Sequence, residues 1–365
     1  MEAIPAPDPP ATGPAINVST RLRVWRILRY VIGLVLAGLA VYAVSGKTDE
    51  LSGASAYIDH LNWAWVILAA VAEAVSYIAF AGMQRRLLGA GHVRVALRPM
   101  TSITLAGNAL QSTLPGGIVV SAAWSFRQFR RFGADEVLSA WVLVAMTATS
   151  FISLAVLAGV GLAMAASTGS ALGLVSVIIG LVVLSGVVVA AWSRRIWFVG
   201  HTIRLLRLSK RIIHRPKGDP HTIIHEALVK VGAISPTWAD WGWATAWGAC
   251  NWLFDLGCLT LAFASVGAAV PWRGLLLAYA AAQLATNLPI TPGGLGVVEG
   301  SLTVALVAFG GAQASTVAAV LIYRVLSFWI ILPIGWGVLG ALTVSHRRRR
   351  IPGPLVLAGR TGGQP

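Results

Sequence analysis

The sequence has 365 residues, of which 56% are hydrophobic and only 11% charged, whereas a soluble domain has about 25% charged residues. This composition excludes a soluble globular enzyme, a disordered chain and a disulfide scaffold. The net charge of +15 does not indicate nucleic acid, because the basic residues lie in short loops between apolar segments, as membrane topology requires. We therefore predict an all-α polytopic integral membrane protein.

The chain begins with a Pro- and Ala-rich segment, 1–20, which lacks the basic start of a signal peptide and is predicted to be a disordered cytoplasmic tail. Beyond it, several apolar segments reach the roughly 20 residues that a helix needs to cross the hydrocarbon core. They are 27–46, 62–83, 137–165, 171–192, 240–266 and 315–343. We therefore expect about six transmembrane helices.

Two further apolar regions, 99–123 and 274–310, are each interrupted by a Pro-Gly-Gly triplet. Pro removes a backbone donor and Gly permits a tight reversal, so each triplet is expected to form the tip of a helical hairpin. The tip residues are Pro115, Gly116 and Gly117 in the first region and Pro292, Gly293 and Gly294 in the second. Backbone at that depth is tolerated only where protein encloses it or where it lines a polar cavity.

The basic residues predict the orientation of these elements. With both termini in the cytoplasm, 25 of the 28 Lys and Arg face that side, while Lys47 and Arg273 face outwards and Arg324 lies within a span. The first hairpin must then enter and leave the membrane from the cytoplasm, and the second from the outside. Both hairpins are therefore predicted to be re-entrant and oppositely oriented, in a protein of the cell membrane.

An internal repeat with an offset of 177 residues supports this arrangement. Besides the triplets, Phe132-Gly133 matches Phe309-Gly310 and Ser150-Phe151 matches Ser327-Phe328. Since the hairpins enter from opposite faces, the repeat is expected to be inverted, as in many transporters. The predicted parts are a membrane domain over 21–345 with halves of about 62–165 and 240–343, a basic cytoplasmic linking segment over 193–234, and a basic cytoplasmic tail over 346–365.

The linking segment mixes apolar side chains such as Ile196, Trp197 and Phe198 with basic ones such as Arg204 and Arg207. One interpretation is an amphipathic surface helix that binds anionic headgroups. The other is a plain connector whose charge only reflects its cytoplasmic location. The sequence leaves both open.

Charged residues inside a membrane are costly and are functional candidates by default. Glu73, Asp255, Glu299 and Arg324 are the charged residues deep in apolar segments, each about 14–18 Å of helical rise from the external end. Glu299 and Arg324 are the expected ion pair, because the hairpin arm and the last span are consecutive and antiparallel. The pair either contacts a substrate headgroup or only anchors the hairpin.

Amide side chains accompany these charges. Asn108 precedes the first tip, Asn287 precedes the second, and Asn251 lies one turn before Asp255. They can satisfy backbone groups freed at the tips or bind a headgroup. No catalytic residue, metal site or cofactor is predicted, because all seven His fall in loops or tails and no P-loop is present.

The segment Asn287-Leu-Pro-Ile-Thr-Pro-Gly-Gly-Leu-Gly-Val-Val-Glu299-Gly300, followed by Leu321-Ile-Tyr-Arg324, resembles the hallmark of one family. This family is the flippase-like membrane domain of lysylphosphatidylglycerol synthases, with its stand-alone YbhN-like relatives. The first half is similar to it as well, through Asn108, the Leu114-Pro-Gly-Gly117 segment and Arg130-Arg-Phe-Gly133. The resemblance covers about residues 25–343 and implies a polytopic domain that moves an anionic or aminoacylated phospholipid between leaflets.

The sequence departs from this family in two ways. The soluble aminoacyl-transferase domain of the full synthases is absent, so the chain is not expected to be an enzyme that makes lysyl-lipid. Many relatives have an acidic residue just after the first glycine pair, whereas here the segment reads Ile118-Val-Val-Ser-Ala122.

The expected function is that of a phospholipid flippase, with a headgroup site formed by Glu299, Arg324, Asp255 and Glu73 together with the three Asn. The alternatives are a transporter of a small or polyprenyl-linked solute, and a non-transporting membrane partner of a lipid-modifying enzyme. Expected partners are membrane phospholipids, with anionic lipid at the basic face, and a lipid-modifying or glycan enzyme.

Overall fold

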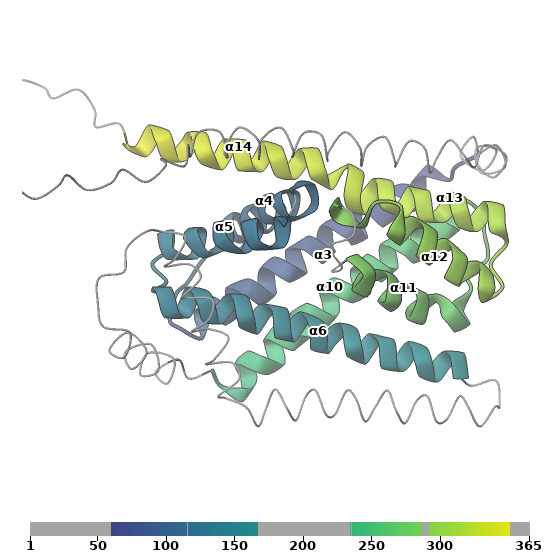
Figure 1. Ribbon diagram of the computed structural model, residues 1–365, viewed down its shortest axis with the longest axis horizontal. Helices are drawn as coiled ribbons and strands as arrows, with labels where there is room; N and C mark the ends of the chain where they lie inside the picture. Colours follow the sequence, from purple (N-terminus) through teal and green to yellow (C-terminus); the bar gives the residue numbers. More distant parts are fainter. Residues whose placement is uncertain (1–59, 115, 167–233, 235, 287–291, 351–365) are drawn as a thin grey trace, which may run out of the picture. The chain divides into compact units, whose positions relative to one another are not determined.

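The computed structural model of the protein describes residues 60–114, 116–166, 234, 236–286 and 292–350 (Figure 1). Several predicted features lie outside these residues: the tail 1–20, the spans 27–46 and 171–192, the linking segment except residue 234, the chain beyond 350, and the side chains of Pro115 and Asn287.

The regular elements of the described residues are all helical, which confirms the all-α fold class. In chain order they are α3 (Trp63–Gly89), α4 (Leu97–Thr113), α5 (Gly117–Arg131), α6 (Glu136–Ala166), α10 (Trp238–Ser265), α11 (Trp272–Thr286), η1 (Pro292–Gly294), α12 (Val297–Ala308), α13 (Gln313–Arg324), η2 (Val325–Trp329) and α14 (Ile331–Arg350).

Three stretches of described helix are long and apolar enough to cross a membrane: Trp63–Gly89, Glu136–Met164 and Gln313–Ser345. They coincide with predicted spans, and the predicted span 240–266 coincides with the 28-residue α10. Large apolar side chains on α3 point outwards, with Ile67 63% and Val71 52% exposed. Such a surface is what lipid contact requires.

The helices repeat at the offset found in the sequence. α5 ends at Arg131 and α12 at Ala308, and the next helices begin at Glu136 and Gln313, each 177 residues apart. The glycines after these hairpin arms, Gly133 and Gly310, have positive φ angles of 92° and 96°. The repeat is therefore present in the backbone as well as in the sequence.

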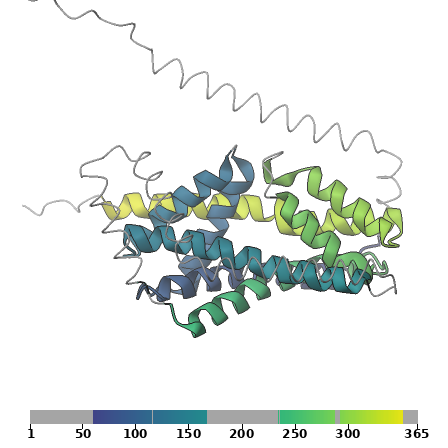
Figure 2. The same ribbon diagram turned by 60° about the horizontal axis from the view of Figure 1, so that its bottom comes forward.

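The two copies run in opposite directions, because the equivalent helices α3 and α10 pack antiparallel. At one end the Asn62 backbone N–H donates to the Ser265 carbonyl, at 2.9 Å. At the other end Arg86 pairs with Asp240, also at 2.9 Å. Since these contacts lie at opposite ends of the pair, α3 and α10 pack along most of their length; Figure 2 gives a second view of the bundle.

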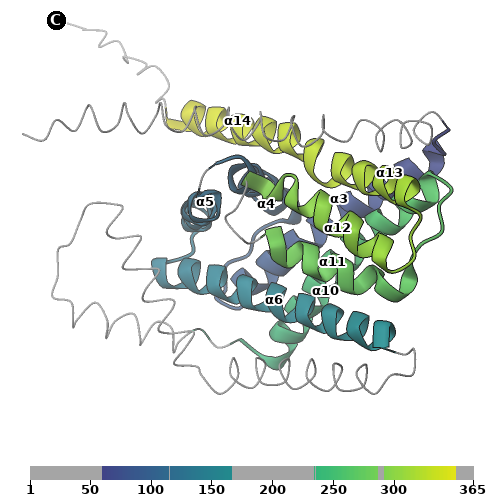
Figure 3. The ribbon, with the colours of Figure 1, turned by 45° about the vertical axis from the view of Figure 1, so that its right-hand side comes forward.

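Each hairpin packs its first arm on a long helix of the other copy, α4 on α14 and α11 on α6 (Figure 3). Glycines permit the close approach. A Cβ at Gly335 of α14 would lie 2.5 Å from the Leu105 carbonyl oxygen of α4, and one at Gly161 of α6 would lie 2.7 Å from the Leu277 backbone nitrogen of α11. Small residues at helix contacts are how membrane helices associate without a hydrophobic driving force.

Two clusters of buried apolar side chains form the core. One includes Met100 and Phe129 and holds the first hairpin against α3 and α6. The other includes Leu259 and Leu302 and holds the second hairpin against α10 and α13. Each hairpin therefore has its own packed support.

The last span departs from the single uninterrupted helix expected from the sequence. It contains the π-helical turn η2, in which the Ile330 N–H donates to the Val325 carbonyl at 2.9 Å. Pro333 accounts for this turn, since it has no N–H for the Trp329 carbonyl and its ring crowds that oxygen. α14 also continues to Arg350, past residue 345, where the tail was expected to begin.

Candidate functional site

The tip of the second hairpin is a short 3₁₀ turn followed by the first turn of α12. Gly293 and Gly294 both have left-handed backbone, with φ of 64° and 70°, a conformation that Gly adopts without steric cost. The Gly296 N–H then donates to the Glu299 carboxylate at 2.7 Å. Glu299 is therefore fixed by the helix start that follows the tip.

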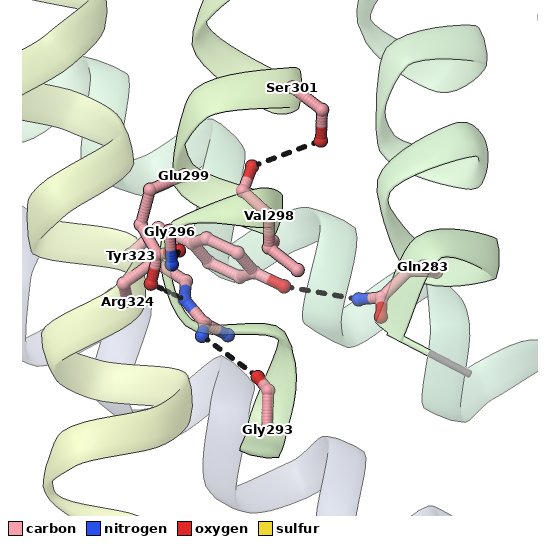
Figure 4. Close-up of polar contacts among 8 residues, drawn as sticks. All are labelled: Gln283, Gly293, Gly296, Val298, Glu299, Ser301, Tyr323 and Arg324. Atoms are coloured by element: carbon pink, nitrogen blue, oxygen red, sulfur yellow. Dashed lines mark hydrogen bonds and ion pairs between the residues drawn. The ribbon is translucent and has the colours of Figure 1, made fainter. Parts of the chain in front are cut away.

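Arg324 reaches this tip from the end of α13 and forms the ion pair expected from the sequence (Figure 4). Its Nε donates to Glu299 Oε1 at 2.6 Å, and its Nη2 donates to the Gly293 carbonyl at 3.2 Å. Its guanidinium also lies over the Phe328 ring, 4.5 Å from the centroid. One cation thus neutralises a carboxylate and satisfies a backbone carbonyl at the helix break.

The Glu299 and Arg324 side chains differ in exposure, at 21% and 7%. The carboxylate therefore lies at the accessible edge of the pair and the guanidinium lies behind it.

The two hairpin tips lie next to each other. A Cβ at Gly293 would be only 3.2 Å from the Ser112 carbonyl oxygen at the end of α4, and α4 packs on η1. Nearby, Ser112 Oγ donates to Asn108 Oδ1 at 2.9 Å and the Asn108 amide donates to the Tyr77 hydroxyl. The tip of the first hairpin is thus neutral and hydrogen-bonded, whereas that of the second is charged.

A second polar cluster surrounds Asp255 on α10. Tyr279 and Gln283 of α11 donate to its Oδ2 at 2.5 and 2.7 Å, and Tyr323 of α13 donates to its Oδ1 at 3.0 Å. Gln283 also donates to the Tyr323 hydroxyl at 3.2 Å (Figure 4). Three donors on one buried carboxyl compensate for much of the water it has lost.

Glu73 of α3 faces this cluster. It is 4% exposed, and it interacts with the Asp255 carboxyl and the Cys258 thiol. Its Oε2 atom has no hydrogen-bond partner among the described residues. Four charged residues predicted to lie at one depth are thus found in two neighbouring clusters, which Tyr323 and Arg324 connect through adjacent positions on α13.

The three Asn have different positions. Asn251 donates to the Ser76 hydroxyl at 2.8 Å and to the Ser76 carbonyl at 3.2 Å, so it joins α3 to α10. Asn108 belongs to the first tip, and Asn287 lies outside the described residues. Among the described residues no group of three His, Cys, Asp or Glu could hold a metal ion.

The sequence analysis did not include the hydroxyl and amide partners of Asp255, which are Tyr279, Gln283 and Tyr323. It also did not include Tyr77, the hydroxyl partner of Asn108. A signal was available in the spacing. Tyr77 follows Glu73 by four residues, and Gln283 follows Tyr279 by four, so each pair shares a helix face inside an otherwise apolar segment.

The sequence matches a family model, described as lysylphosphatidylglycerol synthase TM region, over residues 27–335. The chain belongs to this family. The match confirms the resemblance carried by the 287–300 and 321–324 motifs, and it includes both hairpins and the charged residues of both clusters. No curated protein matches the chain. The family and the apolar helices together identify a helical membrane protein related to lipid metabolism.

Proposed function

We propose that the protein moves an anionic or aminoacylated phospholipid between the leaflets of the cell membrane and catalyses no lipid modification itself. The observation that carries this proposal is the Glu299–Arg324 pair, held at the helix break of the second hairpin beside the tip of the first. Charges at such a place are costly, and a polar headgroup crossing the membrane needs partners of this kind.

The proposal includes a membrane topology. One end of the bundle contains the last turns of α3 and α5 and the first turns of α4 and α6. The basic residues at or near these helix ends are Arg85, Arg86, Arg94, Arg98, Arg127, Arg130 and Arg131. The opposite end, where α11 begins and α12 ends, carries Arg273. We place the basic end in the cytoplasm, where it would contact anionic lipids, so that the two hairpins are re-entrant from opposite faces.

Cysteine labelling tests this topology. Single Cys substitutions next to Arg94 and Arg130 should react with an impermeant maleimide only from the cytoplasmic side. Substitutions next to Arg273 and at Ala312 should react only from the outside. Labelling of the two members of either pair from opposite faces would show that the hairpin crosses the membrane, and the re-entrant arrangement would then be wrong.

A vesicle assay tests the activity. The purified chain is reconstituted with trace phosphatidylglycerol or lysyl-phosphatidylglycerol bearing an acyl-chain fluorophore, and a membrane-impermeant quencher removes the outer-leaflet signal. Vesicles containing the wild type should lose nearly all of the signal, and empty vesicles only the outer-leaflet part. Quenching equal to that of empty vesicles with every lipid, including a polyprenyl phosphate, would contradict the proposal.

Matched variants connect this activity to the site. Glu299→Gln should abolish translocation. Glu136→Gln is the control, because Glu136 pairs with Arg130 at 3.7 Å on the surface, with both side chains more than 40% exposed. The control variant should translocate lipid like the wild type, since exposed pairs contribute little.

A further inference from the structure

The cluster around Asp255 holds two acids in contact. Glu73 and Asp255 are 4% and 8% exposed, and their carboxyl groups interact directly across the α3–α10 contact. Two carboxylates that share a site away from water repel each other strongly, so one of them keeps a proton. The function proposed for the Glu299–Arg324 pair does not involve this proton.

The hydrogen-bond donors indicate which acid holds it. Asp255 receives donors on both oxygens, from Tyr279 and Gln283 on Oδ2 and from Tyr323 on Oδ1. Glu73 Oε2 is buried and has no donor among the described residues. Hydrogen bonds to a carboxylate favour its charged form. Asp255 is therefore the ionised member, and Glu73 is the member with an oxygen free to carry the proton.

Other ionisable groups facing the pair come from each helix that forms the cluster: Tyr77 from α3, Cys258 from α10, Tyr279 from α11, and Tyr323 and Arg324 from α13. The helices α4 and α6 also pack on α3, but their ionisable residues lie in their first turns, at the end of the bundle away from the pair. The turn η2 contains no ionisable residue. Among the described residues, Arg324 is the positive charge that interacts with the pair.

We propose that Glu73 and Asp255 form a site for one exchangeable proton whose release drives the transport step. Glu73–COOH gives its proton to solvent water, which leaves Glu73–COO⁻ and H₃O⁺, so the pair gains one negative charge and no redox partner is needed. The second negative charge attracts Arg324, which already interacts with Asp255, and competes with Glu299 for it. Proton release would thus loosen the ion pair at the second tip.

The coupling to lipid movement rests on the proposed function, whereas proton binding does not, so the two are tested separately. Infrared spectroscopy of the full chain in vesicles measures the carbonyl stretch of a protonated carboxyl group without any reagent. Glu73→Gln keeps the size and neutrality of the protonated side chain and should fold. The wild type should show a carboxylic-acid band that Glu73→Gln lacks and that disappears as the pH is raised.

Each other spectroscopic result overturns the proposal. No Glu73 band at any pH at which the protein is folded would mean that the pair holds no proton. A band that persists at every such pH would mean a permanent, structural proton. A band removed by Na⁺ at constant pH, but not by K⁺, would mean that the site takes a metal cation. Glu136→Gln, which changes only the exposed surface pair with Arg130, is the control variant and should keep the band.

The transport arm uses the vesicle assay with an imposed pH difference. Lipid movement by the wild type should depend on the sign of the gradient, whereas movement by Glu73→Gln should be insensitive to it. A titrating Glu73 band without any lipid movement would refute the proposed function and leave the proton site. Lipid movement that ignores the gradient in the wild type would refute the coupling and leave the proposed function.

Discussion

The two hairpins share a left-handed glycine at the tip but differ in chemistry. Gly116 and Gly293, at equivalent positions of the repeat, have nearly the same φ, 67° and 64°. At the same offset, however, Ala122 corresponds to Glu299 and Thr147 to Arg324. The first tip is closed by Asn108, Ser112 and Tyr77, and the second by an ion pair.

The comparison shows that the two halves share their helix packing but not their charged residues. The close glycine contacts at the long helices exist in both halves, at Gly161 and Gly335. The acid Asp255 does not recur, since the equivalent position in the first half is occupied by Ile78. We infer that both hairpins share one folding requirement, while the second carries the polar function.

The largest effect should come from removing the charge that only the second tip has. Glu299→Gln leaves Arg324, 7% exposed, without a carboxylate and should destabilise the protein by about 3–5 kcal/mol. The unfolding free energy in detergent measures this. The double variant Glu299→Arg with Arg324→Glu should recover much of the loss, and Thr147→Val, at the equivalent of Arg324, should cost less than about 1 kcal/mol. Additive effects of the two charge changes would show that the pair is not coupled.

The next effect separates the tips by their surroundings. Ala at Gly116 or Gly293 would be held in a left-handed conformation that costs about 1–2 kcal/mol. At Gly293 the new Cβ would also collide with the Phe328 ring, whereas nothing lies within 4 Å at Gly116. The unfolding free energy of Gly293→Ala should therefore be about 1 kcal/mol lower than that of Gly116→Ala. Equal losses of thermal stability in the two variants would indicate that the second tip rearranges around the new Cβ without a free-energy cost.

The shared packing predicts matched losses in the two halves. Gly161→Ala and Gly335→Ala place a Cβ against the backbone of α11 and α4 respectively, and each should cost about 1–3 kcal/mol. Gly159→Ala and Gly337→Ala are controls on the same helices, with no atom within 4 Å of the added Cβ. They should leave the unfolding free energy unchanged or raise it by up to about 1 kcal/mol. A loss confined to one half would mean that the hairpins are supported differently.

The smallest effect concerns the link between the acids and the tip. Tyr323→Phe removes the donor on Asp255 Oδ1 and should cost about 1.5 kcal/mol, as expected for one hydrogen bond to a charged group. Its counterpart in the first half, Met146, has no such bond, and Met146→Leu should be close to neutral. If Tyr323→Phe were also neutral in stability and transport, this hydroxyl would not connect the two clusters.

Much of this architecture follows from the sequence alone. Apolar length predicted α6 and α10 to within two residues, and the starts of α3 and α13 equally well, because hydrocarbon thickness fixes how long such helices must be. The helices α3 and α14 extend six and seven residues beyond their predicted ends, through Arg85 and Arg86 in α3 and through Arg347 to Arg350 in α14. The Pro-Gly-Gly triplets located both helix breaks, since few other residues allow a left-handed reversal. The ion pair could be predicted as well, because an unpaired Arg324 inside a membrane is too costly.

Only the tertiary structure decided which side chains share a cluster. The sequence placed Glu73, Asp255, Glu299 and Arg324 at a common depth, but depth does not specify which helix faces meet. The antiparallel packing of α3 and α10 brings Glu73 to Asp255. The first arm of the second hairpin, α11, supplies Tyr279 and Gln283, and α13 supplies Tyr323. These contacts depend on rotation about each helix axis, which close packing at glycines sets and which apolar composition leaves undetermined.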